Sequence, residues 1–363
     1  MRILGLMSGT SCDGLDCIDV NLNLDKFYNF EFKINNFSTI KYTQEERFFL
    51  SSLKNIDYDS TNEDEGRLSR IFINHINSFM NKYNNRYDII ACHGHTVKHI
   101  DKVISIQLIS PEMLYDIYKI PIVYNFRESD IYHGGNGAPL MPFLDYLLFG
   151  RSKANVVTLN IGGISNITYI PSSGDRSKII GFDTGPGMSL IDKASEIFFG
   201  ESIDRDSVYS REGEVNKILL NELMKIDYIF QVPPKSTDSN EFGYKLIDTI
   251  TNKFSSMSSF DMIRTLVQFT IDSIQFNIDK FIKGDDFKLI YSGGGTEHPI
   301  ILTWLNNMSC TTESISNYGI DSSIKESLLM ASLGYSRVEK IPNNMPSVTG
   351  AKEYILLGDI YER

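Results

Sequence analysis

The sequence predicts an α/β protein of two domains, each a mixed β-sheet flanked by helices. Its 363 residues exceed the size of a typical single core and suit two domains. Hydrophobic residues make up 42% of the chain and charged residues 22%, which is typical of globular proteins. Short apolar or alternating segments, typical of strands, are interspersed with longer segments of helical periodicity. That mixture is typical of sheets covered by helices.

A first series of elements extends from the N-terminus to the glycine-rich segment GGNGAPL at 134–140. Apolar or alternating residues predict three early strands in a meander, and helical spacing of apolar residues predicts the amphipathic helix that follows. We expect strands at 2–7, 17–24, 27–37 and 87–92, a helix over 66–83, and a further helix and strand between 111 and 124. The strand at 87–92 is expected to end in the segment HGHT.

A similar second series follows the glycine-rich segment. We expect strands at 156–161, 167–170, 179–182 and 287–291, and helices at about 190–199, 214–224, 243–253 and 261–282. The boundary is predicted near 127–139. Residues 1–127 plus about 341–363 are therefore expected to form the N-terminal domain, and 128–340 the C-terminal domain.

The charge balance argues against some classes of partner. Lys and Arg number 35 against 46 Asp and Glu, a net charge of −11, and no basic run occurs. Nucleic acid or an anionic membrane as main partner would need a clustered basic surface. The apolar run at the N-terminus is too short for a signal peptide or a membrane span, so we expect a cytoplasmic location. The cysteines, Cys12, Cys17, Cys92 and Cys310, are scattered and are expected to be reduced structural thiols.

The segment from Gly9 to Asp16 follows the first predicted strand. Glycine, threonine and serine in a turn let backbone N–H groups and hydroxyls approach phosphate oxygens. Asp13 and Asp16 offer the hard oxygen ligands that Mg²⁺ prefers. The segment matches neither the Walker A nor the dinucleotide-binding pattern, so a tight structural hairpin is an equal alternative. Its residues are Gly9, Thr10, Ser11, Cys12, Asp13, Gly14, Leu15 and Asp16.

Three later strands are also expected to lead into glycine-containing turns. Gly162 and Gly163 follow one strand, Asp183 ends another just before Thr-Gly-Pro-Gly, and the last runs into three glycines. Active-site groups of α/β sheets gather at such strand ends. A carboxylate there can act as a general base, although a turn or N-cap role for Asp183 is the plainer alternative. The last three glycines are Gly293, Gly294 and Gly295. Together these turns suggest a nucleotide held between two domains by backbone contacts.

These motifs give the chain a specific resemblance. It resembles the anhydro-N-acetylmuramic acid kinases, members of the actin- and hexokinase-like ATPase superfamily. The resemblance spans nearly the whole chain, and the order MSGTS-x-DG-x-D, NIGG and FDTGPG is highly specific. The matching segments are GLMSGTSCDGLD at 5–16, HGHTVKH at 93–99, FRESDIYHGGNGAPL at 126–140, NIGGISN at 160–166, FDTGPG at 182–187, PPKST at 233–237, SGGGTEHP at 292–299, KESLLMASLGY at 325–335 and PSVTGA at 346–351.

The resemblance implies two actin-like (ribonuclease H-like) domains with a cleft between them that binds ATP and an anhydrosugar. It implies that Asp183 takes a proton from water, that this water attacks the anomeric carbon of the 1,6-anhydro ring, and that O6 accepts the γ-phosphoryl group of ATP. N-acetylmuramic acid 6-phosphate is the implied product. By the same resemblance, Gly9 to Asp16 and Gly162–Gly163 hold the ATP phosphates, and Gly293–Gly295 lie against the adenosine.

The resemblance further implies Mg²⁺, with Asp16 and Glu326 as ligands, and a homodimer. The sugar contacts that it implies are His93, His95, Arg127, Asp130, Gly185 and Glu326. Plainer alternatives are an exposed helical side chain for Glu326 and an ion pair at the domain boundary for Arg127 and Asp130. The spacing of His93, His95 and His99 also permits zinc as a minor alternative.

Several positions depart from the family's usual residues. They are His95 for glutamine, Asn125 for aspartate, Asn136 for glutamine, Met188 for asparagine, and Asp238, Ser239 and Asn240 where Gly-Arg-Glu usually follows PPKST. We expect these changes to lie where the sugar binds. Loss of an arginine suits a substrate without the lactyl carboxylate, because arginine is the usual bidentate partner of a carboxylate. A kinase for another 1,6-anhydrosugar such as levoglucosan is therefore an alternative, as is a nucleotide-dependent sugar sensor without catalysis.

Overall fold

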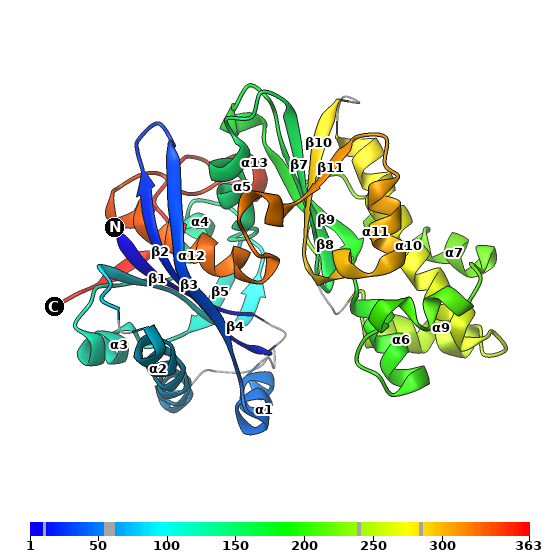
Figure 1. Cartoon of the computed structure of the whole chain (residues 1–363), viewed down its shortest axis with the longest axis horizontal. Helices are drawn as coiled ribbons and strands as arrows, with labels where there is room; N and C mark the ends of the chain where they lie inside the picture. Colours follow the sequence, from blue (N-terminus) through cyan, green and yellow to red (C-terminus); the bar gives the residue numbers. More distant parts are fainter. Residues whose placement is uncertain (10–11, 54–61, 84, 238–240, 283–285) are drawn as a thin grey trace. The chain divides into compact units, whose positions relative to one another are not determined.

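The computed structural model describes residues 1–9, 12–53, 62–83, 85–237, 241–282 and 286–363. The chain divides into two compact units (Figure 1). Unit 1 contains Met1–Leu148 and Ser323–Arg363, and unit 2 contains Phe149–Ser322. No helix among the described residues is long and apolar enough to cross a membrane.

Unit 1 is built on a mixed sheet. Its strands are β1 (Arg2–Ser8), β2 (Gly14–Leu24), β3 (Phe30–Lys41), β4 (Ile89–Ile100), β5 (Ile104–Leu108), β6 (Ile122–Tyr124) and β12 (Asp359–Tyr361). Its helices are α1 (Gln44–Ser52), α2 (Asn62–Tyr83), α3 (Pro111–Tyr118), α4 (Glu128–Tyr132), α5 (Met141–Phe149), α12 (Lys325–Val338) and α13 (Pro346–Thr349). The strand order is β12-β6-β4-β1-β2-β3, with β5 paired to β4. β1, β2 and β3 pair antiparallel, whereas β4 lies parallel to β1 and β6 parallel to β4.

Alternate residues of β1 face opposite sides of this sheet, as the pleat of a strand requires. Leu4 and Leu6 lie in one core cluster with Phe72 of α2. Gly5 faces α12 on the other side, where a Cβ would lie 2.4 Å from the carbonyl oxygen of Ser327. Only glycine allows α12 to pack so closely against β1.

Unit 2 repeats the topology of unit 1. Its strands are β7 (Asn155–Ile161), β8 (Ile164–Ile170), β9 (Ile180–Pro186), β10 (Phe287–Ser292) and β11 (Thr311–Ser314). Its helices are α6 (Ser189–Phe199), α7 (Lys217–Leu223), α8 (Asp227–Phe230), α9 (Tyr244–Lys253), α10 (Ser259–Phe281) and α11 (Pro299–Asn306), and a 3₁₀ helix, η4, spans Gly294–Glu297. The order β11-β10-β7-β8-β9 combines three antiparallel strands with two parallel ones, as in unit 1. This order is that of actin-like (ribonuclease H-like) domains, so the predicted fold class is confirmed.

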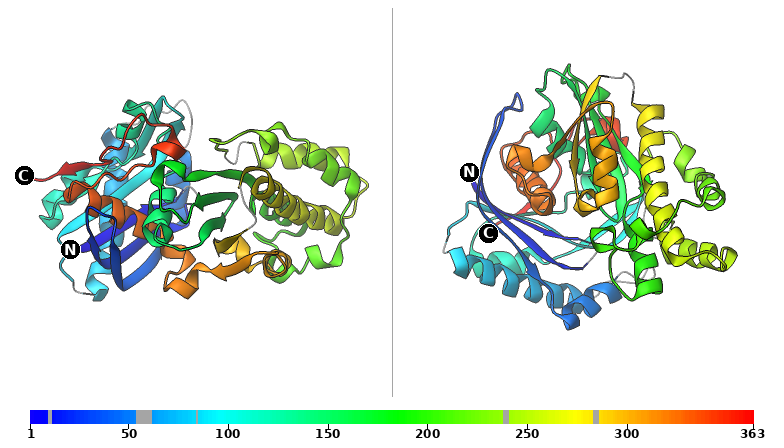
Figure 2. Two further views of the ribbon diagram at one scale, coloured as in Figure 1. Left: turned by 90° about the horizontal axis from the view of Figure 1, so that it is seen from above. Right: turned by 45° about the vertical axis from the view of Figure 1, so that its right-hand side comes forward.

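The long helix α10, yellow in Figure 2, covers one face of the unit 2 sheet. Its apolar side shares a core cluster with β7 and α6, to which Leu266, Leu159 and Ile191 belong. All three side chains are fully buried. The predicted helix at 261–282 is thus confirmed, and its apolar stripe faces the sheet as the spacing requires.

Three strands extend beyond their predicted limits at places that matter for the site. β2 begins at Gly14 instead of residue 17, and β4 continues through HGHT to Ile100. β9 continues to Pro186, so Asp183 lies within the strand and not at its end. Pairing with neighbouring strands, which a local pattern does not reveal, extends each of them. Helices α1, α5 and α11 and strands β5, β11 and β12 are additional elements that the sequence did not predict.

The two units divide the chain elsewhere than at the predicted boundaries of 127/128 and 340/341. Residues 128–148 and 323–340 belong to unit 1. Helix α12 packs on β1, and its Lys325 forms a buried ion pair of 2.8 Å with Asp145 of α5. The glycine-rich segment is an ordered turn of unit 1, where the Gly137 N–H donates to Asp130. Glycine content alone thus does not mark a linker.

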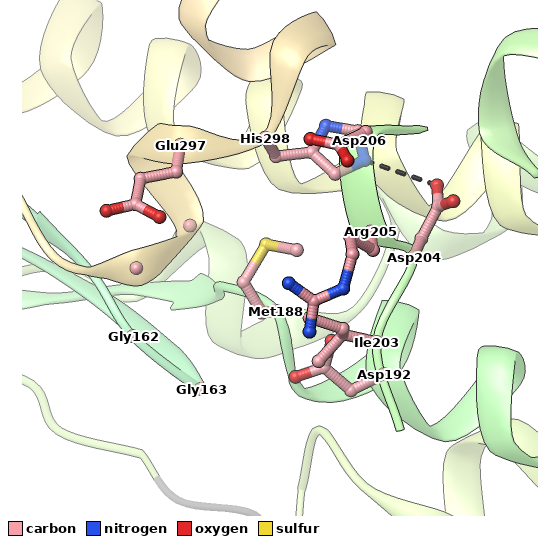
Figure 3. A pocket seen from close by; sticks show the side chains of 12 residues that line it. Gly162, Gly163, Met188, Asp192, Ile203, Asp204, Arg205, Asp206, Glu297 and His298 are labelled. Atoms are coloured by element: carbon pink, nitrogen blue, oxygen red, sulfur yellow. Dashed lines mark hydrogen bonds and ion pairs between the residues drawn. The ribbon is translucent and has the colours of Figure 1, made fainter. Parts of the chain in front are cut away.

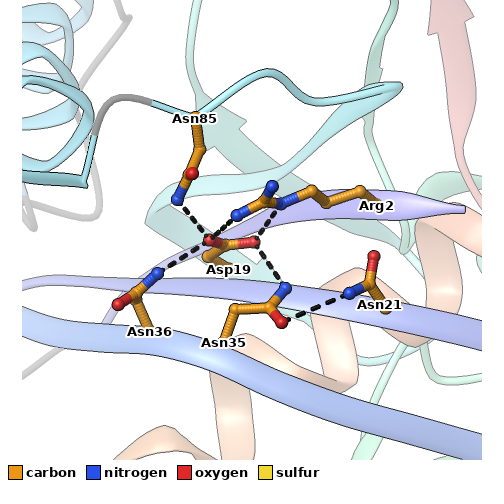
Figure 4. Close-up of polar contacts among 6 residues, drawn as sticks. All are labelled: Arg2, Asp19, Asn21, Asn35, Asn36 and Asn85. Carbon is orange, nitrogen blue, oxygen red and sulfur yellow. Dashed lines mark hydrogen bonds and ion pairs between the residues drawn. The ribbon is translucent and has the colours of Figure 1, made fainter.

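A buried carboxylate joins neighbouring strands of the unit 1 sheet (Figure 4). Asp19 of β2 has no exposed side-chain surface, and both its oxygens accept from Arg2, at 2.8 and 2.6 Å. Burial alone would raise the pKa of Asp19, but hydrogen bonds from Arg2 and from asparagines outweigh it, and the pKa is lowered. The asparagine donors are Asn35, Asn36 and Asn85, at 3.1, 3.0 and 2.7 Å. The cluster therefore joins three strands and the segment after α2.

Exchange of Asp19 for alanine is expected to lower the free energy of unfolding by about 3–5 kcal/mol, because it leaves a partly buried arginine and three amides without their acceptor. The matched exchange of exposed Asp116, which pairs with Lys119, should change it by less than about 1 kcal/mol. Urea unfolding followed by circular dichroism measures both. Since the folded-state pKa of Asp19 is lowered, its contribution is present above an unfolded pKa of about 3.9 and lost as the pH falls through the folded value. Equal stability of the two variants would contradict a fastening role for Asp19.

Candidate functional site

The turn after β1 is the first predicted phosphate-binding segment. Thr10 and Ser11 lie outside the described residues. Cys12 adopts a left-handed conformation with φ of 56°, and its N–H donates to the Gly9 carbonyl oxygen at 3.1 Å. Its side chain is buried in the core of unit 1, so only its backbone can face a ligand. The exposed Asp13 follows, and its carbonyl accepts from the Tyr42 N–H.

A buried chain of polar groups lies against this turn. The Tyr42 hydroxyl donates to Ser8 Oγ at 3.0 Å, and Ser8 Oγ lies 3.0 Å from His95 Nδ1. His95 Nε2 lies 4.0 Å from Cys12 Sγ. His95 is fully buried. The prediction that His95 contacts the sugar is therefore not supported, because HGHT lies inside β4 and its second histidine points into the protein. These contacts make His95 a support for the turn.

Gly14, Leu15 and Asp16 belong to β2 instead of the turn. Leu15 is a core side chain with no exposed surface. Close packing explains the glycine at position 14, because a Cβ there would lie 2.6 Å from the Ile40 carbonyl oxygen. Asp16 is half-buried and accepts a short hydrogen bond from the Thr39 hydroxyl. Of these residues, Asp16 alone presents a side chain suited to binding a ligand.

Asp16 and Glu326 form an acidic pair. Burial raises the pKa of Asp16 and that of Glu326, and the charge of Asp16 raises that of Glu326 further, while Arg127 lowers it. Although surrounding protein atoms remove water from the carboxyl group, part of the Glu326 residue is exposed to solvent, so a ligand can reach this residue. Two mutually repelling carboxylates suit Mg²⁺, which takes one or two carboxylates and completes its shell with water and phosphate oxygens. The donor set in unit 1 therefore fits this ion.

His93 and Arg127 form a second polar group in unit 1. Arg127 Nε donates to His93 Nε2 at 3.0 Å, and Arg127 Nη1 donates to the Gly137 carbonyl at 2.8 Å. Burial lowers the pKa of His93 to about 3, and the charge of Arg127 adds to that effect. Burial also lowers the pKa of Arg127, to about 10, whereas Glu326 opposes the shift. Arg127 is thus a charged, half-buried donor held in place by a neutral histidine.

Asp130 is fully buried, and both of its oxygens are used within unit 1. One accepts from the Gly137 N–H at 2.9 Å and the other from the Thr349 hydroxyl at 2.9 Å. A Cβ on Gly135 would lie 2.1 Å from this carboxylate, which explains that glycine. These contacts favour the structural alternative for Asp130, which shapes the glycine-rich turn, over direct sugar binding.

No group of three histidine, cysteine or acidic residues that could hold a metal ion occurs among the residues described. His99 lies at the exposed end of β4, where its Nε2 is 3.1 Å from Asp101. His93 instead accepts from Arg127. The zinc alternative therefore has no support in the described part of the chain.

In unit 2, Asp183 lies within β9 against the PPKST segment. Its N–H donates to the Lys235 carbonyl at 3.3 Å, and its Oδ2 accepts from the Thr237 N–H at 2.9 Å. The Tyr228 hydroxyl donates to the Asp183 carbonyl at 2.9 Å. The carboxylate is half-buried, which leaves part of it open to a substrate. Backbone and side chain are thus both oriented, as a general base requires.

The turn between β7 and β8 packs on the start of α6. The carbonyls of Gly162 and Gly163 accept from the N–H groups of Met188 and Gly187, at 2.8 and 2.9 Å. A Cβ on Gly187 would lie 2.1 Å from the Gly162 carbonyl oxygen. Cβ atoms on Gly162 and Gly163 themselves would meet no atom closer than 3.7 Å, so these two glycines face open space.

That open space is part of a cavity of about 380 Å³ in unit 2 (Figure 3). Its floor and walls combine the glycine turn, the start of α6, the segment after α6 and η4. The lining residues are Gly162, Gly163, Met188, Asp192, Ile203, Asp204, Arg205, Asp206, Gly294, Gly295, Glu297 and His298. An apolar and backbone surface rimmed by a few charged groups is typical of small-molecule sites.

Two acidic groups of this cavity have distinct environments. Burial raises the pKa of Asp192 to about 7, and its buried Oδ1 has no hydrogen-bond partner among the described residues. Asp204 is buried too, but its Oδ2 lies 3.2 Å from His298 Nε2 and its Oδ1 accepts from the Tyr209 N–H at 2.8 Å. Burial opposes ionisation of Asp204, yet these hydrogen bonds leave its pKa lowered. Asp204 thus supports the wall, whereas Asp192 retains an acceptor for a ligand.

The three glycines after β10 have different roles. Gly293 has a φ of 93°, and a Cβ there would lie 2.5 Å from the Ile161 carbonyl oxygen. A Cβ on Gly295 would lie 2.4 Å from Ile161 Cγ2. Gly294 meets nothing within 4 Å and faces the cavity. Gly185, with φ of 133°, packs against Ser273 Oγ of α10, so packing explains this predicted sugar contact.

The departures from the family's usual residues do not gather at one place. Asn125 Nδ2 donates to Glu128 and, at 2.7 Å, to Asp359, where an aspartate would add a third negative charge. Met188 lines the cavity beside Gly295. The buried Oδ1 of Asn136 has no partner among the described residues. Asp238, Ser239 and Asn240 lie outside the described residues. Among the changed residues that the structure describes, Asn136 alone retains a buried polar atom without a partner. The expectation that these changes surround the sugar is not supported for His95, Asn125 and Met188.

Some side chains of the site were not predicted. The backbone carbonyl of Lys235 and the hydroxyl of Tyr228 contact Asp183. Asp192 and Arg205 line the cavity. The PPKST motif already marked the position of Lys235. The segment that carries Arg205 has no pattern of its own, and only the fold brings it to the glycine turns.

Comparison with known proteins identifies the family. A family profile described as anhydro-N-acetylmuramic acid kinase matches residues 1–363. The anhydro-N-acetylmuramic acid kinase of Clostridioides difficile is 31% identical and covers 99% of this chain and 98% of its own length. The one of Aliivibrio fischeri is 33% identical and covers 99% of both chains. A solved structure, component A of (R)-2-hydroxyglutaryl-CoA dehydratase from Acidaminococcus fermentans, is 9% identical with a TM-score of 0.43, over 91% of this chain and 97% of its own. The full-length matches show that the chain belongs to the anhydro-N-acetylmuramic acid kinase family.

Proposed function

We propose that the chain is an ATP-dependent kinase that opens the 1,6-anhydro ring of 1,6-anhydro-N-acetylmuramic acid with water and phosphorylates O6. The observation that carries this proposal is the full-length family match together with the oriented Asp183 carboxylate. The product is N-acetylmuramic acid 6-phosphate, with ADP. A cytoplasmic location and a homodimer are proposed from the same resemblance.

The cavity of unit 2 is proposed to hold the nucleoside of ATP. Its glycines leave a smooth backbone surface for a flat base, and Met188 adds an apolar contact. The buried acceptor on Asp192 suits a hydroxyl or amino donor of the nucleoside. In unit 1, the backbone around Gly9 and Cys12 is proposed to bind phosphate oxygens, as turns rich in N–H groups do.

Asp183 is proposed to act as general base. It removes a proton from water, the water oxygen bonds to C1, and the bond between C1 and O6 breaks. The released O6 then bonds to the γ-phosphorus, and ADP leaves. A donor such as Arg127, charged and half-buried in unit 1, suits the lactyl carboxylate of the sugar.

Asp16 and Glu326 are proposed to bind Mg²⁺ directly or through its waters. The ion, when bound, neutralises charge on the phosphates of ATP. The two carboxylates lie close enough for the charge of Asp16 to raise the pKa of Glu326, and one cation between them would relieve that repulsion.

The substrate proposal makes a direct prediction about the product. Purified protein with ATP, Mg²⁺ and 1,6-anhydro-N-acetylmuramic acid, in water labelled with oxygen-18, should yield the 6-phosphate with one heavy oxygen at C1. Labelling at C1 follows from water attack at the anomeric carbon, and mass spectrometry measures it. N-acetylmuramic acid is the control, because it has no 1,6-anhydro bridge to open.

Phosphorylation of levoglucosan, measured beside that of the muramic sugar, distinguishes the proposed kinase from a kinase for another anhydrosugar and from a sensor without catalysis. Faster phosphorylation of levoglucosan than of the muramic sugar would correct the substrate but keep the reaction. ATP binding without turnover of either sugar would leave the sensor alternative and reject the proposed kinase.

A further inference from the structure

Lys235 is a buried lysine in an aromatic cage. Only 7% of its surface is exposed, and its Nζ donates to the carbonyls of Tyr228 and Ile229, both at 3.1 Å. Three ring centroids lie 4.8, 5.4 and 5.6 Å from Nζ, those of Tyr228, Phe281 and Phe182. Removing an ammonium group from water is costly, and these carbonyls and rings offset part of that cost. The Lys235 ammonium is therefore held by two hydrogen bonds and three ring contacts in addition to ordinary packing.

The segment that Lys235 fastens also orients Asp183. The Lys235 carbonyl accepts from the Asp183 N–H, and two residues later the Thr237 N–H donates to Asp183 Oδ2. Tyr228 connects Lys235 to Asp183, because its ring contacts the Lys235 ammonium and its hydroxyl donates to the Asp183 carbonyl. Movement of Lys235 would therefore displace the donor that sets the direction of the carboxylate.

We propose that Lys235 is a positioning residue for Asp183, which fixes the segment that orients the carboxylate and supplies a positive charge that keeps it ionised. The proposal rests on the proposed function, since it assumes that Asp183 is the base. An ionised carboxylate is the form that accepts a proton from water, and a nearby positive charge favours that form.

The groups that face Lys235 come from several elements. Asp183 lies on β9, Tyr228 on α8 and Phe281 on α10, and Glu241 follows the segment in the chain. Burial lowers the pKa of Lys235 to about 8, although the charges of Asp183 and Glu241 oppose this shift. The attraction is reciprocal, so the same ammonium stabilises the charge on Asp183. Glu241 is further held by the Thr237 hydroxyl at 2.9 Å.

The test compares Lys235→Met, Lys235→Arg and wild type by the pH profiles of kcat and kcat/KM. Lys235→Met is expected to lower kcat and to move the acid limb of kcat/KM up by about 1 to 3 pH units, the effect of losing an opposite charge. Wild type is expected to lose activity above about pH 8, because Lys235 loses its proton there and with it the cation–ring contacts that hold the segment against Asp183. Lys235→Arg should keep activity to higher pH, because arginine stays charged.

The control is Lys253→Met on α9. Lys253 is exposed, pairs with Glu222 at 2.7 Å and lies 5.9 Å from the ring of Phe254. The exchange therefore removes an ion pair and a cation–ring contact that do not involve Asp183. Its profiles should equal those of wild type. The fraction of folded protein and the KM for ATP are measured for every variant.

A lowered folded fraction with an unshifted acid limb in Lys235→Met would overturn the proposal and leave a structural role. If Lys235→Met does not fold, wild type and Lys235→Arg are compared instead. Loss of activity at the same basic pH in both proteins would also overturn the proposal. Absence of turnover in wild type would reject the proposed function and the role of Lys235 together. Normal turnover with unshifted limbs would reject the role of Lys235 alone.

Discussion

Exchange of Asp183 for asparagine is expected to lower kcat by about 100-fold to about 10,000-fold, the range that a general base contributes. The amide keeps an oxygen that can accept from the Thr237 N–H, so the local fold should persist. An amide cannot take the proton of the attacking water. Affinity for ATP should stay unchanged, because Asp183 does not line the cavity. Steady-state kinetics with the anhydrosugar and calorimetric titration with ATP measure the two effects.

Asp248→Asn is the matched control, since Asp248 is exposed on α9 in the same unit. It should be as active as wild type. Turnover of Asp183→Asn near the wild-type rate would remove Asp183 as the base. Loss of ATP binding together with turnover would show instead that the exchange disturbs the unit as a whole.

Local patterns in the sequence predict most of the fold, and long-range packing accounts for what they miss. The strands at the N-terminus and the helix α10 have clear periodicity, and both are confirmed. β5 and β12 are short and owe their conformation to pairing with β4 and β6, which no local pattern shows. Helix α12 belongs to unit 1 because Gly5 and Gly334 let it approach the sheet, and their partners are remote in sequence.

The candidate site is predictable where a motif places a residue at a strand and its turn. Motifs mark Asp183, Gly294 and Asp16; Gly294 follows strand β10 as expected, whereas Asp183 and Asp16 lie within β9 and β2, and none of the three is fully buried. The predicted sugar contact of His95 has no support in the structure, because this histidine of a polar-looking motif lies inside β4 and is buried. Asp192 carries no motif. Its importance depends on a cavity formed by four separate segments, which only the folded chain assembles.

The glycine at position 294 is the sharpest test of the nucleoside cavity. A Cβ on Gly294 would meet no atom within 4 Å, so leucine there should project into the cavity without disturbing the protein. We expect Gly294→Leu to weaken ATP binding by at least about 100-fold, or about 2.8 kcal/mol, because the side chain occupies the space proposed for the base. The unfolding temperature without nucleotide should stay near that of wild type. Calorimetric titration with ATP and thermal unfolding measure the two effects.

Two further glycine exchanges make this result specific. Gly66→Leu on α2 is the matched control, since its nearest atom would be 3.5 Å away and leucine favours helix, so ATP binding should be unchanged. Gly295→Ala should lower stability instead, because its Cβ would lie 2.4 Å from Ile161 Cγ2. If Gly294→Leu binds ATP as tightly as wild type, the nucleoside binds elsewhere. If it loses both stability and binding as Gly295→Ala does, the open space beside Gly294 is needed for folding and not for ATP. Stable protein that no longer binds ATP is the one result that assigns this cavity to the nucleoside.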